Sequence, residues 1–493
     1  MTRMTRRVFL KGLTATGAYA ALGGAAKGYP FSRVRGANGD IRIAVIGVGS
    51  SVSMGGKGKH HIEMFRQIEG VRVVALCDAD RNTLAQEAAK FSERHENVDT
   101  HVDMRDVLER KDIDAVVIAT PNHWHSLAAV WACQAGKDVY VEKPVSHNIW
   151  EGRKIVEAAR KYGRIVQAGT QSRSDEALQE VFEYINDGKL GRIKCVHGIC
   201  YKRRPSIGKV EGPQEVPADV DYNLWSGPVA MEPLMRKNLH YDWHWFWSTG
   251  NGDIGNQGIH EMDMCRWVLG EKGVAPRAMS VGGRFGYDDD GQTPNTQVAI
   301  LDYEAAPIIF EVRGLTRKAG DQGMDNYRTQ RIGIVVQCED GCFAGGAGGG
   351  WFYNSAGTRV QQFSSTGGGG HQANFIKAVR SRKKEDLNAE ILNGHISSAL
   401  CHLANVSYQM GKDAGPERVR EATKDRGDMA DTLDRLFAHL EANEVDLSAT
   451  PLRLGAAVEM DVEAEQFVGK TAAEANKMLK GEYRKPFVVP EEV

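Results

Sequence analysis

Apolar residues after position 40 recur as short, almost unbroken runs separated by stretches with helical spacing. The runs IRIAVIGVG at 41–49, VRVVALCDA at 71–79 and DAVVIAT at 114–120 would be apolar on both faces of an extended chain. Between the second and third runs, RNTLAQEAAKF at 81–91 has the spacing of an amphipathic helix. Strands that are buried on both faces and alternate with helices indicate a parallel sheet covered on both sides. We therefore predict a doubly wound α/β domain over residues 41–171.

The pattern changes beyond residue 171, where apolar runs follow one another with short turns between them. TQVAILDYE at 296–304 and PIIFEVRG at 307–314 are separated by only two residues. Such spacing is typical of a large, mostly antiparallel open sheet. We predict an α+β domain over 172–412 and a C-terminal extension over 413–493, whose pattern after 441 is too weak to place.

The N-terminal residues have the pattern of a targeting segment. TRRVFLKGLTATGAYAALGGAA at 5–26 places an arginine pair before a short, mildly apolar stretch with small residues that suit cleavage. Paired arginines with such a stretch resemble a twin-arginine signal, which delivers folded proteins across the bacterial inner membrane. We expect a signal segment at 1–26, a linker at 27–40 and a periplasmic or extracellular location; a basic disordered tail is the alternative. We expect no membrane span in the mature chain.

Composition narrows the class of partner. The formal net charge is −2 and charged residues make up 26% of 493, so the chain lacks the basic footprint of a nucleic-acid-binding protein. Its eight cysteines include no CxxC pair, which argues against a disulfide scaffold or a zinc ribbon. His240 and His244 have the i, i+4 spacing of metal ligands, but no third ligand follows at metal spacing, and we expect no metal. A small-molecule substrate fits these features best.

A glycine-rich turn directly follows the first predicted strand. In VIGVGS, Gly47 and Gly49 let the backbone approach a pyrophosphate at the N-terminus of the next helix. An insertion displaces the usual third glycine, so Gly56 or Gly58 would take its packing role. Asp78 ends the second strand, where a carboxylate binds the ribose 2′-hydroxyl. This context predicts a dinucleotide site rather than a simple glycine turn.

Polar residues also stand at the ends of the later strands, where open α/β sheets bind ligands. ATPNHWH places Pro121, Asn122 and His125 at one strand end, and DVYVEKP places Glu142 and Lys143 at another. A lysine beside a nicotinamide would hold a substrate hydroxyl or accept its proton, provided that its pKa is depressed. The alternative for the Glu-Lys pair is an ion pair on the surface.

These stretches, taken in order along the chain, resemble the Gfo/Idh/MocA family of oxidoreductases. The matching motifs are VIGVG, ATPNHWH, EKP, GTQSR, DYNLWSGP, GDIGNQGIHEMD and HQANFIKAVRSRK, which lie between residue 41 and about residue 412. The resemblance implies a Rossmann domain, then a domain whose open sheet carries the substrate site and often mediates oligomerisation, so we expect a homo-oligomer. It also implies a sugar or cyclitol substrate and tightly bound NAD or NADP. Asp78 favours NAD, and Arg81 leaves NADP open.

The resemblance assigns roles to single residues. The family's central lysine corresponds to Lys143 and its catalytic histidine to His260. Many family dehydrogenases have an aspartate four residues before that histidine, where this chain has Asn256. An amide positions a hydroxyl or a water but accepts no proton, so proton transfer would fall to His260, Lys143 or a residue elsewhere.

Two sets of contacts follow from these assignments. The expected cofactor contacts are Gly47, Gly49, Asp78, Pro121, Asn122, His125, Glu142, Lys143 and Gln171. The expected substrate contacts are Arg173, Tyr201, Trp243, His244, Trp245, Asn256 and Asp263. In a helix Asn256, His260 and Asp263 share one face, whereas Asp253 and Glu261 lie off it. The aromatic run HYDWHWFW would stack on the C–H faces of a sugar, with a purely buried segment as the alternative.

These features favour an exported NAD(P)-dependent carbohydrate oxidoreductase, in which hydride passes between a sugar carbon and a tightly bound nucleotide. An exported enzyme has no free NAD to exchange, so each cycle should return the nucleotide to its starting state. The NQGIHEMD form is similar to the branch of NAD-dependent α-N-acetylgalactosaminidases, which cleave glycosides by transient oxidation, elimination, hydration and re-reduction. The alternatives are a two-substrate sugar oxidoreductase, an ordinary sugar or cyclitol dehydrogenase, and a non-catalytic sugar-binding protein on the same scaffold.

Overall fold

The first sheet of the computed structural model, which describes residues 39–50, 56–426 and 429–493, is wholly parallel. Its strands, in spatial order, are β3 (Asp99–His101), β2 (Val71–Cys77), β1 (Ile41–Ile46), β4 (Ala115–Ile118), β5 (Asp138–Val141) and β6 (Val166–Ala168). This order is that of a doubly wound Rossmann sheet, and it confirms the predicted fold of the first domain.

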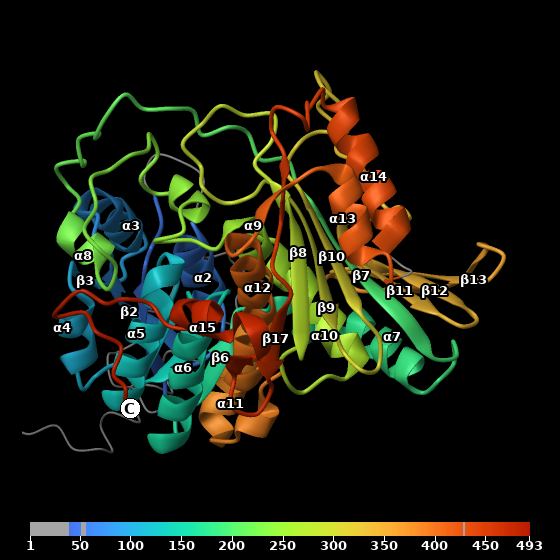
Figure 1. Ribbon diagram of the computed structural model, residues 1–493. Coiled ribbons are helices and arrows are strands. Elements are labelled where there is room, and N and C mark those ends of the chain that lie inside the picture. The colour runs from blue at the N-terminus through green and yellow to red at the C-terminus, as the bar shows by residue number, and fades with distance from the viewer. Residues whose placement is uncertain (1–38, 51–55, 427–428) are drawn as a thin grey trace, which may run out of the picture. The chain divides into compact units, whose positions relative to one another are not determined.

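Helices cover this sheet on both sides, and successive residues of β1 explain why. Ile43 and Val45 belong to one core cluster, and Ala44 and Ile46 belong to another. Because side chains alternate along a strand, an unbroken apolar run supplies both cores at once. The helices that follow the strands are α2 (Lys57–Arg66), α3 (Arg81–Glu93), α4 (Met104–Glu109), α5 (Asn122–Gln134) and α6 (Ile149–Lys161) (Figure 1).

The second sheet is large and mostly antiparallel, as predicted. Its main path runs β14 (Arg359–Ser364), β13 (Gly349–Asn354), β12 (Gly341–Gly346), β11 (Ile332–Cys338), β7 (Ile193–Tyr201), β10 (Ile308–Arg313), β9 (Thr296–Asp302), β8 (Arg277–Gly283), β16 (Leu452–Leu454) and β15 (Lys412–Ala414). The small strands β17 (Val458–Asp461) and β18 (Gln466–Val468) attach at β8. Within this sheet β7 and β10 run parallel to each other.

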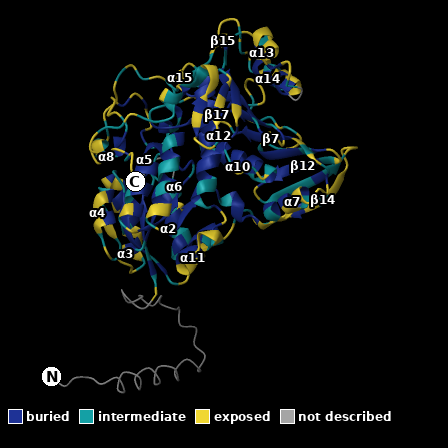
Figure 2. Ribbon diagram, turned by 60° about the horizontal axis from the view of Figure 1, so that its bottom comes forward, coloured by how far each residue is buried: buried dark blue, intermediate teal, exposed yellow. Residues whose placement is uncertain are grey.

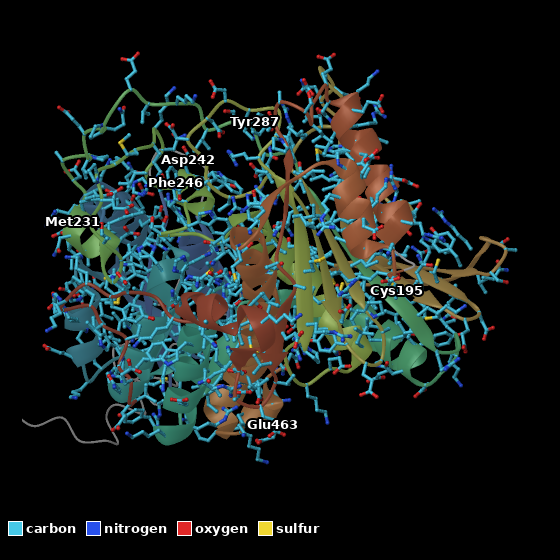
Figure 3. The ribbon with its side chains drawn as sticks, viewed as in Figure 1. Cys195, Met231, Asp242, Phe246, Tyr287 and Glu463 are labelled. Carbon is cyan, nitrogen blue, oxygen red and sulfur yellow. The ribbon has the colours of Figure 1, made fainter. Side chains whose placement is uncertain are left out.

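Each face of the second sheet has its own helices (Figure 1). One core contains residues of α7 (Glu176–Asn186), α10 (Gly258–Leu269) and α12 (Ile391–Gln409), and α12 is coloured as largely buried in Figure 2. The other core lies under α13 (Pro416–Thr423) and α14 (Met429–Ala442). Cys195 of β7 belongs to this second core (Figure 3). The weakly patterned C-terminal extension therefore supplies a helical cover and edge strands.

Residues from the end of the chain return to the first sheet. Phe375 of α11 (His371–Ser381) packs with Ile43 and Val45, and Ile391 and Phe487 join the core on the other side of that sheet. The predicted boundaries at 171 and 412 therefore do not separate independent cores. Sequence patterns missed this because the returning segments are short and far from the sheet in the chain.

The predicted signal segment at 1–26 lies outside the described residues, as does the linker up to residue 38. Among the residues that the structure describes, no helix combines the length and the apolar character needed to cross a bilayer.

Candidate active site

A cavity of about 360 Å³ lies at the carboxyl ends of the parallel strands of the first sheet. Its lining combines the glycine turn after β1, the ends of β2, β4 and β5, and residues of the second domain between 202 and 260. Carboxyl ends of parallel strands are where open α/β sheets bind ligands, so this cavity is the candidate active site.

One end of the cavity is made of backbone. Gly47 has a φ of +82°, and a Cβ added to it would lie 2.5 Å from the amide nitrogen of Thr120. A Cβ added to Gly58 would lie 2.1 Å from the carbonyl oxygen of Gly47. Gly58 therefore takes the close-packing role of the third glycine, whereas Gly56 has ordinary space around it. The first turn of α2 can thus approach the glycine turn closely, as a pyrophosphate site requires.

Asp78 closes this end of the cavity. Its Oδ2 accepts hydrogen bonds from the backbone N–H groups of Val48 at 2.7 Å and Gly49 at 3.2 Å, and its Oδ1 accepts one from Asp80. Burial raises the pKa of the Asp78 carboxyl, and these backbone donors oppose the rise. Nearby, Thr120 lines the cavity with a buried hydroxyl that has no hydrogen-bond partner. The glycine cradle, the carboxylate and this free hydroxyl fit a dinucleotide.

His125 and Asn122, which were expected to contact the cofactor, line the cavity with their polar atoms already engaged. The two ring nitrogens of His125 lie 2.6 Å from the carbonyl oxygen of Pro144 and 2.8 Å from that of Thr120. The side-chain amide of Asn122 donates to Asn251 at 2.9 Å. His125 thus links the segments that follow β4 and β5, Asn122 links the start of α5 to Asn251, and Pro121 also lies in the lining.

Glu142, which was expected to contact the cofactor, lines the cavity, is largely buried and remains ionised. Burial alone would raise its pKa, but the charges of Lys57, His61 and Lys143 hold the pKa well below its usual range. His61 Nε2 lies 2.8 Å from Oε1 of Glu142, and Lys57 Nζ lies 3.7 Å from the same oxygen. Glu142 is therefore a fixed negative charge beside Lys143 rather than half of a surface ion pair.

The side chain of Lys143, a residue of the first domain, contacts Asn256 of the second domain. Its Nζ donates to the backbone carbonyl of Asn256 at 2.7 Å and lies 3.4 Å from the side-chain oxygen of the same residue. Burial lowers the pKa of Lys143 to about 8, although the charge of Glu142 opposes this. The ammonium group can therefore lose its proton in the range where enzymes work.

His260 lines the same cavity as Lys143, but the pKa of its side chain is much lower. Burial, followed by the positive charge of Lys143, lowers the pKa of His260 to about 3, so its imidazole is neutral at pH 7. Its Nδ1 is buried without a hydrogen-bond partner. The predicted continuous helix is divided here, because α9 (Gly252–Asn256) ends just before Gln257 and α10 starts at Gly258. Asn256 and His260 nevertheless both line the cavity.

Several residues that line the cavity were not among the predicted site residues. Lys202 donates to Gln257 at 2.8 Å, and Arg204 pairs with Asp253 at 2.6 Å while it donates to the Tyr241 hydroxyl at 3.0 Å. The basic run KRR at the end of β7 was the available signal. It was not used because strands also end in basic residues at ordinary surfaces. Trp225 and His240 are further lining residues that were not predicted as contacts.

The aromatic run contributes part of the substrate end. Trp243 and His244 line the cavity, and their rings stack with centroids 3.6 Å apart. Burial lowers the pKa of His244 to about 3, so this ring is also neutral at pH 7. Trp245, in contrast, is buried outside the lining with the Arg204 guanidinium over its ring.

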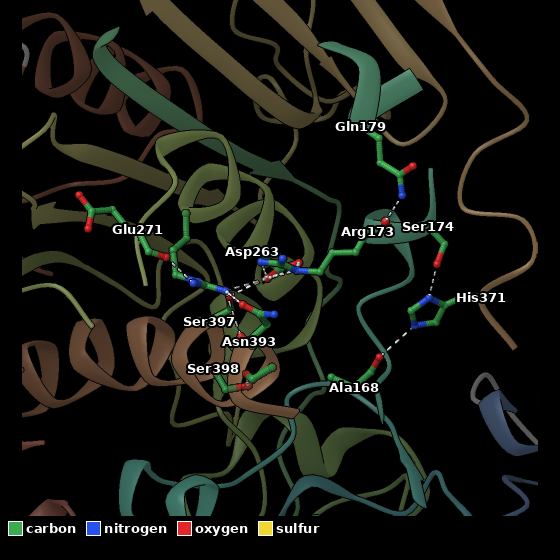
Figure 4. A network of polar contacts seen from close by, with 12 residues as sticks. Ala168, Arg173, Ser174, Gln179, Asp263, Glu271, His371, Asn393, Ser397 and Ser398 are labelled. Atoms are coloured by element: carbon green, nitrogen blue, oxygen red, sulfur yellow. Dashed lines mark hydrogen bonds and ion pairs between the residues drawn. The ribbon is translucent and has the colours of Figure 1, made fainter. Parts of the chain in front are cut away.

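Other predicted contacts lie elsewhere and are corrected here. Arg173 and Asp263 form a buried ion pair at 2.8 Å, and Ser397 donates to Asp263 at 2.6 Å (Figure 4). Tyr201 is buried on the second sheet with its hydroxyl donating to Glu311 at 2.6 Å. Gln171 also lies outside the cavity lining. The helical-face argument failed for Asp263 because that residue sits one turn beyond the cavity, in the interior of the domain.

Asp253 and Glu261, the two acidic residues that lie off the predicted helix face, differ in their partners and in their protonation. Asp253 neutralises Arg204. Glu261 is buried, and burial raises the pKa of its carboxyl to about 8, so it is mostly protonated at neutral pH. Neither of them lines the cavity.

Two family models match the chain in succession. The first, described as "Oxidoreductase family, NAD-binding Rossmann fold", covers residues 41–170, and the second, "Oxidoreductase family, C-terminal alpha/beta domain", covers residues 192–312. The chain therefore belongs to the Gfo/Idh/MocA family of NAD-binding oxidoreductases. The match confirms the family, the fold and the cofactor class that the motifs had indicated.

Individual relatives match smaller parts. Inositol 2-dehydrogenase of Salmonella typhimurium is 29% identical over 179 residues, which is 36% of this chain and 50% of that protein. A glycosyl hydrolase family 109 protein of Shewanella sp. is 32% identical over 126 residues, or 24% of this chain and 26% of that protein. The chain thus spans half or less of the length of these relatives.

A solved structure shows the same fold over a longer stretch. The WlbA dehydrogenase of Bordetella pertussis, crystallised with NADH and UDP-GlcNAcA, covers 74% of this chain and 95% of its own, with a TM-score of 0.54 and 20% identity.

Proposed function

We propose that this protein is an NAD-dependent oxidoreductase that acts on a sugar or a sugar-like polyol. The observation that carries the proposal is a single cavity lined at one end by Gly47, Gly49 and Asp78 and at the other by Lys143 and His260. NAD, when bound, would accept a hydride from a sugar carbon and return it. The chain itself supplies the positioning of the substrate and the transfer of its hydroxyl proton.

Lys143 is the proposed proton acceptor. A base must be free of its proton and basic enough to take another, and the pKa of about 8 meets both needs near neutral pH. His260 is neutral, but its pKa of about 3 makes it a weak acceptor, so its proposed role is to orient the sugar hydroxyl. The backbone carbonyl of Asn256 accepts a hydrogen bond from the Lys143 amine at 2.7 Å, and the side-chain oxygen of Asn256 lies 3.4 Å from the same nitrogen, so Asn256 has a positioning role.

The residues that line the substrate end of the cavity favour a carbohydrate as the substrate. Trp243 and Tyr241 offer aromatic faces, and Lys202 and Arg204 offer donors to hydroxyl or acidic groups. At the other end, Asp78 supports NAD rather than NADP, because a carboxylate repels a 2′-phosphate. Arg81, which left NADP open, is exposed and not part of the lining.

A cycle that regenerates the nucleotide is the finer part of the proposal. The arginine pair near the N-terminus supports export of the folded protein to the periplasm or beyond, where free NAD is not supplied. The similarity to a glycosyl hydrolase family 109 protein supports a redox-neutral glycoside cleavage. The similarity to an inositol 2-dehydrogenase supports the second candidate, an ordinary sugar or cyclitol dehydrogenase. A homo-oligomer remains a prediction from the family.

The experiment that separates these functions uses the purified protein without added NAD. Its absorbance would first be read for co-purified nucleotide, and a panel of glycosides, free sugars and cyclitols would then be added. Glycoside cleavage with no net change in nucleotide absorbance supports the redox-neutral cycle. Stoichiometric nucleotide reduction that stops after one turnover supports a dehydrogenase. Absence of bound nucleotide, with none bound on addition, contradicts the proposal and favours a sugar-binding protein.

A further inference from the structure

A second cavity, of about 290 Å³, lies outside the candidate active site. We call it the Arg236 cavity; it is lined by Tyr222, Trp225, Ser226, Val229, Ala230, Glu232, Pro233, Met235, Arg236, Phe246, Ser248, Thr249 and Gln292. Among the described residues of the two linings, Trp225 alone belongs to both. The redox proposal above makes no use of this second cavity.

Arg236 is the unusual member of this lining. Its side chain is only 7% exposed, and its Nε and Nη2 are buried without a hydrogen-bond partner. Within residues 56–426 no carboxylate lies within 4 Å of it, in contrast to Arg204 and Arg173, which each pair with an aspartate. A buried guanidinium has five N–H donors and normally pairs them, because an unpaired buried charge is costly.

Burial lowers the pKa of Arg236, and the surroundings partly offset this without using its donors. The guanidinium carbon of Arg236 lies 4.9 Å from the ring centroid of Trp225 and 5.4 Å from that of Phe246. Asp242 and Glu232 are the nearby acids, and they favour the charged form only at longer range. Cation–π contacts attract the charge but leave N–H groups in the guanidinium plane free to bind an acceptor.

We propose that the Arg236 cavity binds an oxyanion, a carboxylate or a sulfate or phosphate group, carried by a small molecule with an apolar body. A guanidinium matches the two oxygens of such a group with two parallel hydrogen bonds. The hydroxyl of Ser248 and the amide of Gln292 lie in the same lining, whereas the Thr249 hydroxyl there already donates to the carbonyl oxygen of Trp243 at 2.8 Å.

The rest of the lining indicates the apolar body of the ligand. Val229, Pro233 and Met235 form that part of the cavity, and Met235 is 37% exposed. Met231, 55% exposed, lies at the outer edge of this region, while Phe246 lies further inside (Figure 3). The lining thus places apolar side chains in the same cavity as the guanidinium.

The test measures binding of sodium sulfate and sodium benzoate to the full chain by isothermal titration calorimetry, with ionic strength held constant by sodium chloride. Benzoate binding with no sulfate binding identifies a carboxylate on an apolar body, and the reverse identifies a sulfate or phosphate group. Methyl benzoate, which lacks the charge, should not bind. Binding of neither anion overturns the proposal.

Four variants locate the site. Arg236→Gln should weaken anion binding at least tenfold, while Lys237→Gln, which removes the exposed neighbouring charge, should leave it within twofold. Lys202→Gln removes a cation from the active-site cavity and should also leave it unchanged. Ser248→Phe fills the second cavity but keeps the arginine, and it should abolish binding. Loss of binding in Lys202→Gln but not in Arg236→Gln would place the anion in the other cavity and overturn the proposal.

Thermal unfolding separates a ligand site from a structural arginine. Without anion, Arg236→Gln should unfold at the same temperature as the wild type or higher, because it removes an unpaired buried charge. With anion, the wild type should gain stability and the variant should not. A variant that unfolds several degrees lower without anion would show that the arginine serves packing against the two rings, and the proposal would fail.

Discussion

The two ends of the active-site cavity are built in different ways. The nucleotide end consists mainly of backbone from one short stretch, in which Gly47 and Gly58 approach each other closely and Asp78 binds the turn from the next strand. The substrate end consists of side chains from distant parts of the chain, such as Lys143, Arg204 and His260. A backbone cradle tolerates few residue types at fixed positions, whereas a cluster of side chains depends on the whole tertiary structure. The following predictions would break or sharpen this contrast.

The largest effect is expected at the substrate end. Lys143→Met should lower kcat by about 10²–10⁴-fold, the range for removal of a group that transfers a proton, with little change in nucleotide affinity. The exposed Lys189→Met serves as a control that should retain full activity. Rates can be measured as single-turnover nucleotide reduction. Retained turnover in Lys143→Met would remove this lysine from the mechanism.

Asp263 tests whether the residues behind the substrate end are structural. Asp263→Asn would leave Arg173 as an unpaired buried charge and should lower the free energy of unfolding by about 3–5 kcal/mol. Turnover per folded molecule should be preserved, because Asp263 does not line the cavity. Urea denaturation and activity of the folded fraction measure the two quantities. Asp434→Asn, which removes the exposed partner of Arg420, should change stability little. An unchanged stability with lost turnover in Asp263→Asn would return Asp263 to the site.

The nucleotide end should respond to a single methyl group. Gly58→Ala places a Cβ 2.1 Å from the Gly47 carbonyl oxygen, so the turn must move at a cost of about 1–3 kcal/mol, and nucleotide affinity should fall. Gly56→Ala is a matched control two residues away, where the nearest atom to the added Cβ is a Lys59 side-chain carbon at 3.7 Å. Fluorescence titration with NADH compares the two. Equal affinities would show that the glycine turn is not a close-packed cradle.

The smallest expected effect is the dependence of the reaction rate on pH. Because the pKa of Lys143 is lowered to about 8, the neutral amine that accepts a proton forms as the pH rises toward 8. The rate of substrate oxidation should therefore increase about tenfold per pH unit below 8 and level off above it. Substrate reduction needs the protonated form and should decline over the same range. A flat oxidation profile between pH 6 and 9 would assign the proton to another group.

Sequence patterns predicted the nucleotide end well and the substrate end incompletely. The glycine turn, Asp78 and the strand-end residues could be found because a strand followed by glycines and a helix constrains the backbone locally. Arg204 and Gln257 line the cavity but were missed. In the case of Arg204, the neighbouring residues in the sequence do not distinguish an arginine that pairs with Asp253 from an arginine at the surface.

Two wrong expectations, for Asp263 and Trp245, show the limits of placing side chains from their spacing in the sequence. Asp263 was placed with Asn256 and His260 because i, i+4 and i+7 positions align in one helix, but a shared face does not fix depth. Asp263 lies one turn beyond His260 in the same helix α10, where it pairs with Arg173 in the interior. Trp245 was grouped with Trp243 as part of one aromatic run, but both lie in a short 3₁₀ helix, Asp242–Trp245, in which residues two apart point in different directions.

The return of Phe487 to the first sheet has a consequence for how the chain is made. Phe487 packs 5.4 Å from the ring of Trp124 and belongs to the core beside β4 and β5. A ribosome releases those strands long before it adds Phe487, so this core must wait, partly open, while several hundred residues are synthesised. Folding intermediates on the ribosome should therefore expose the surface around Trp124, and chaperones that bind apolar surface have their longest opportunity there.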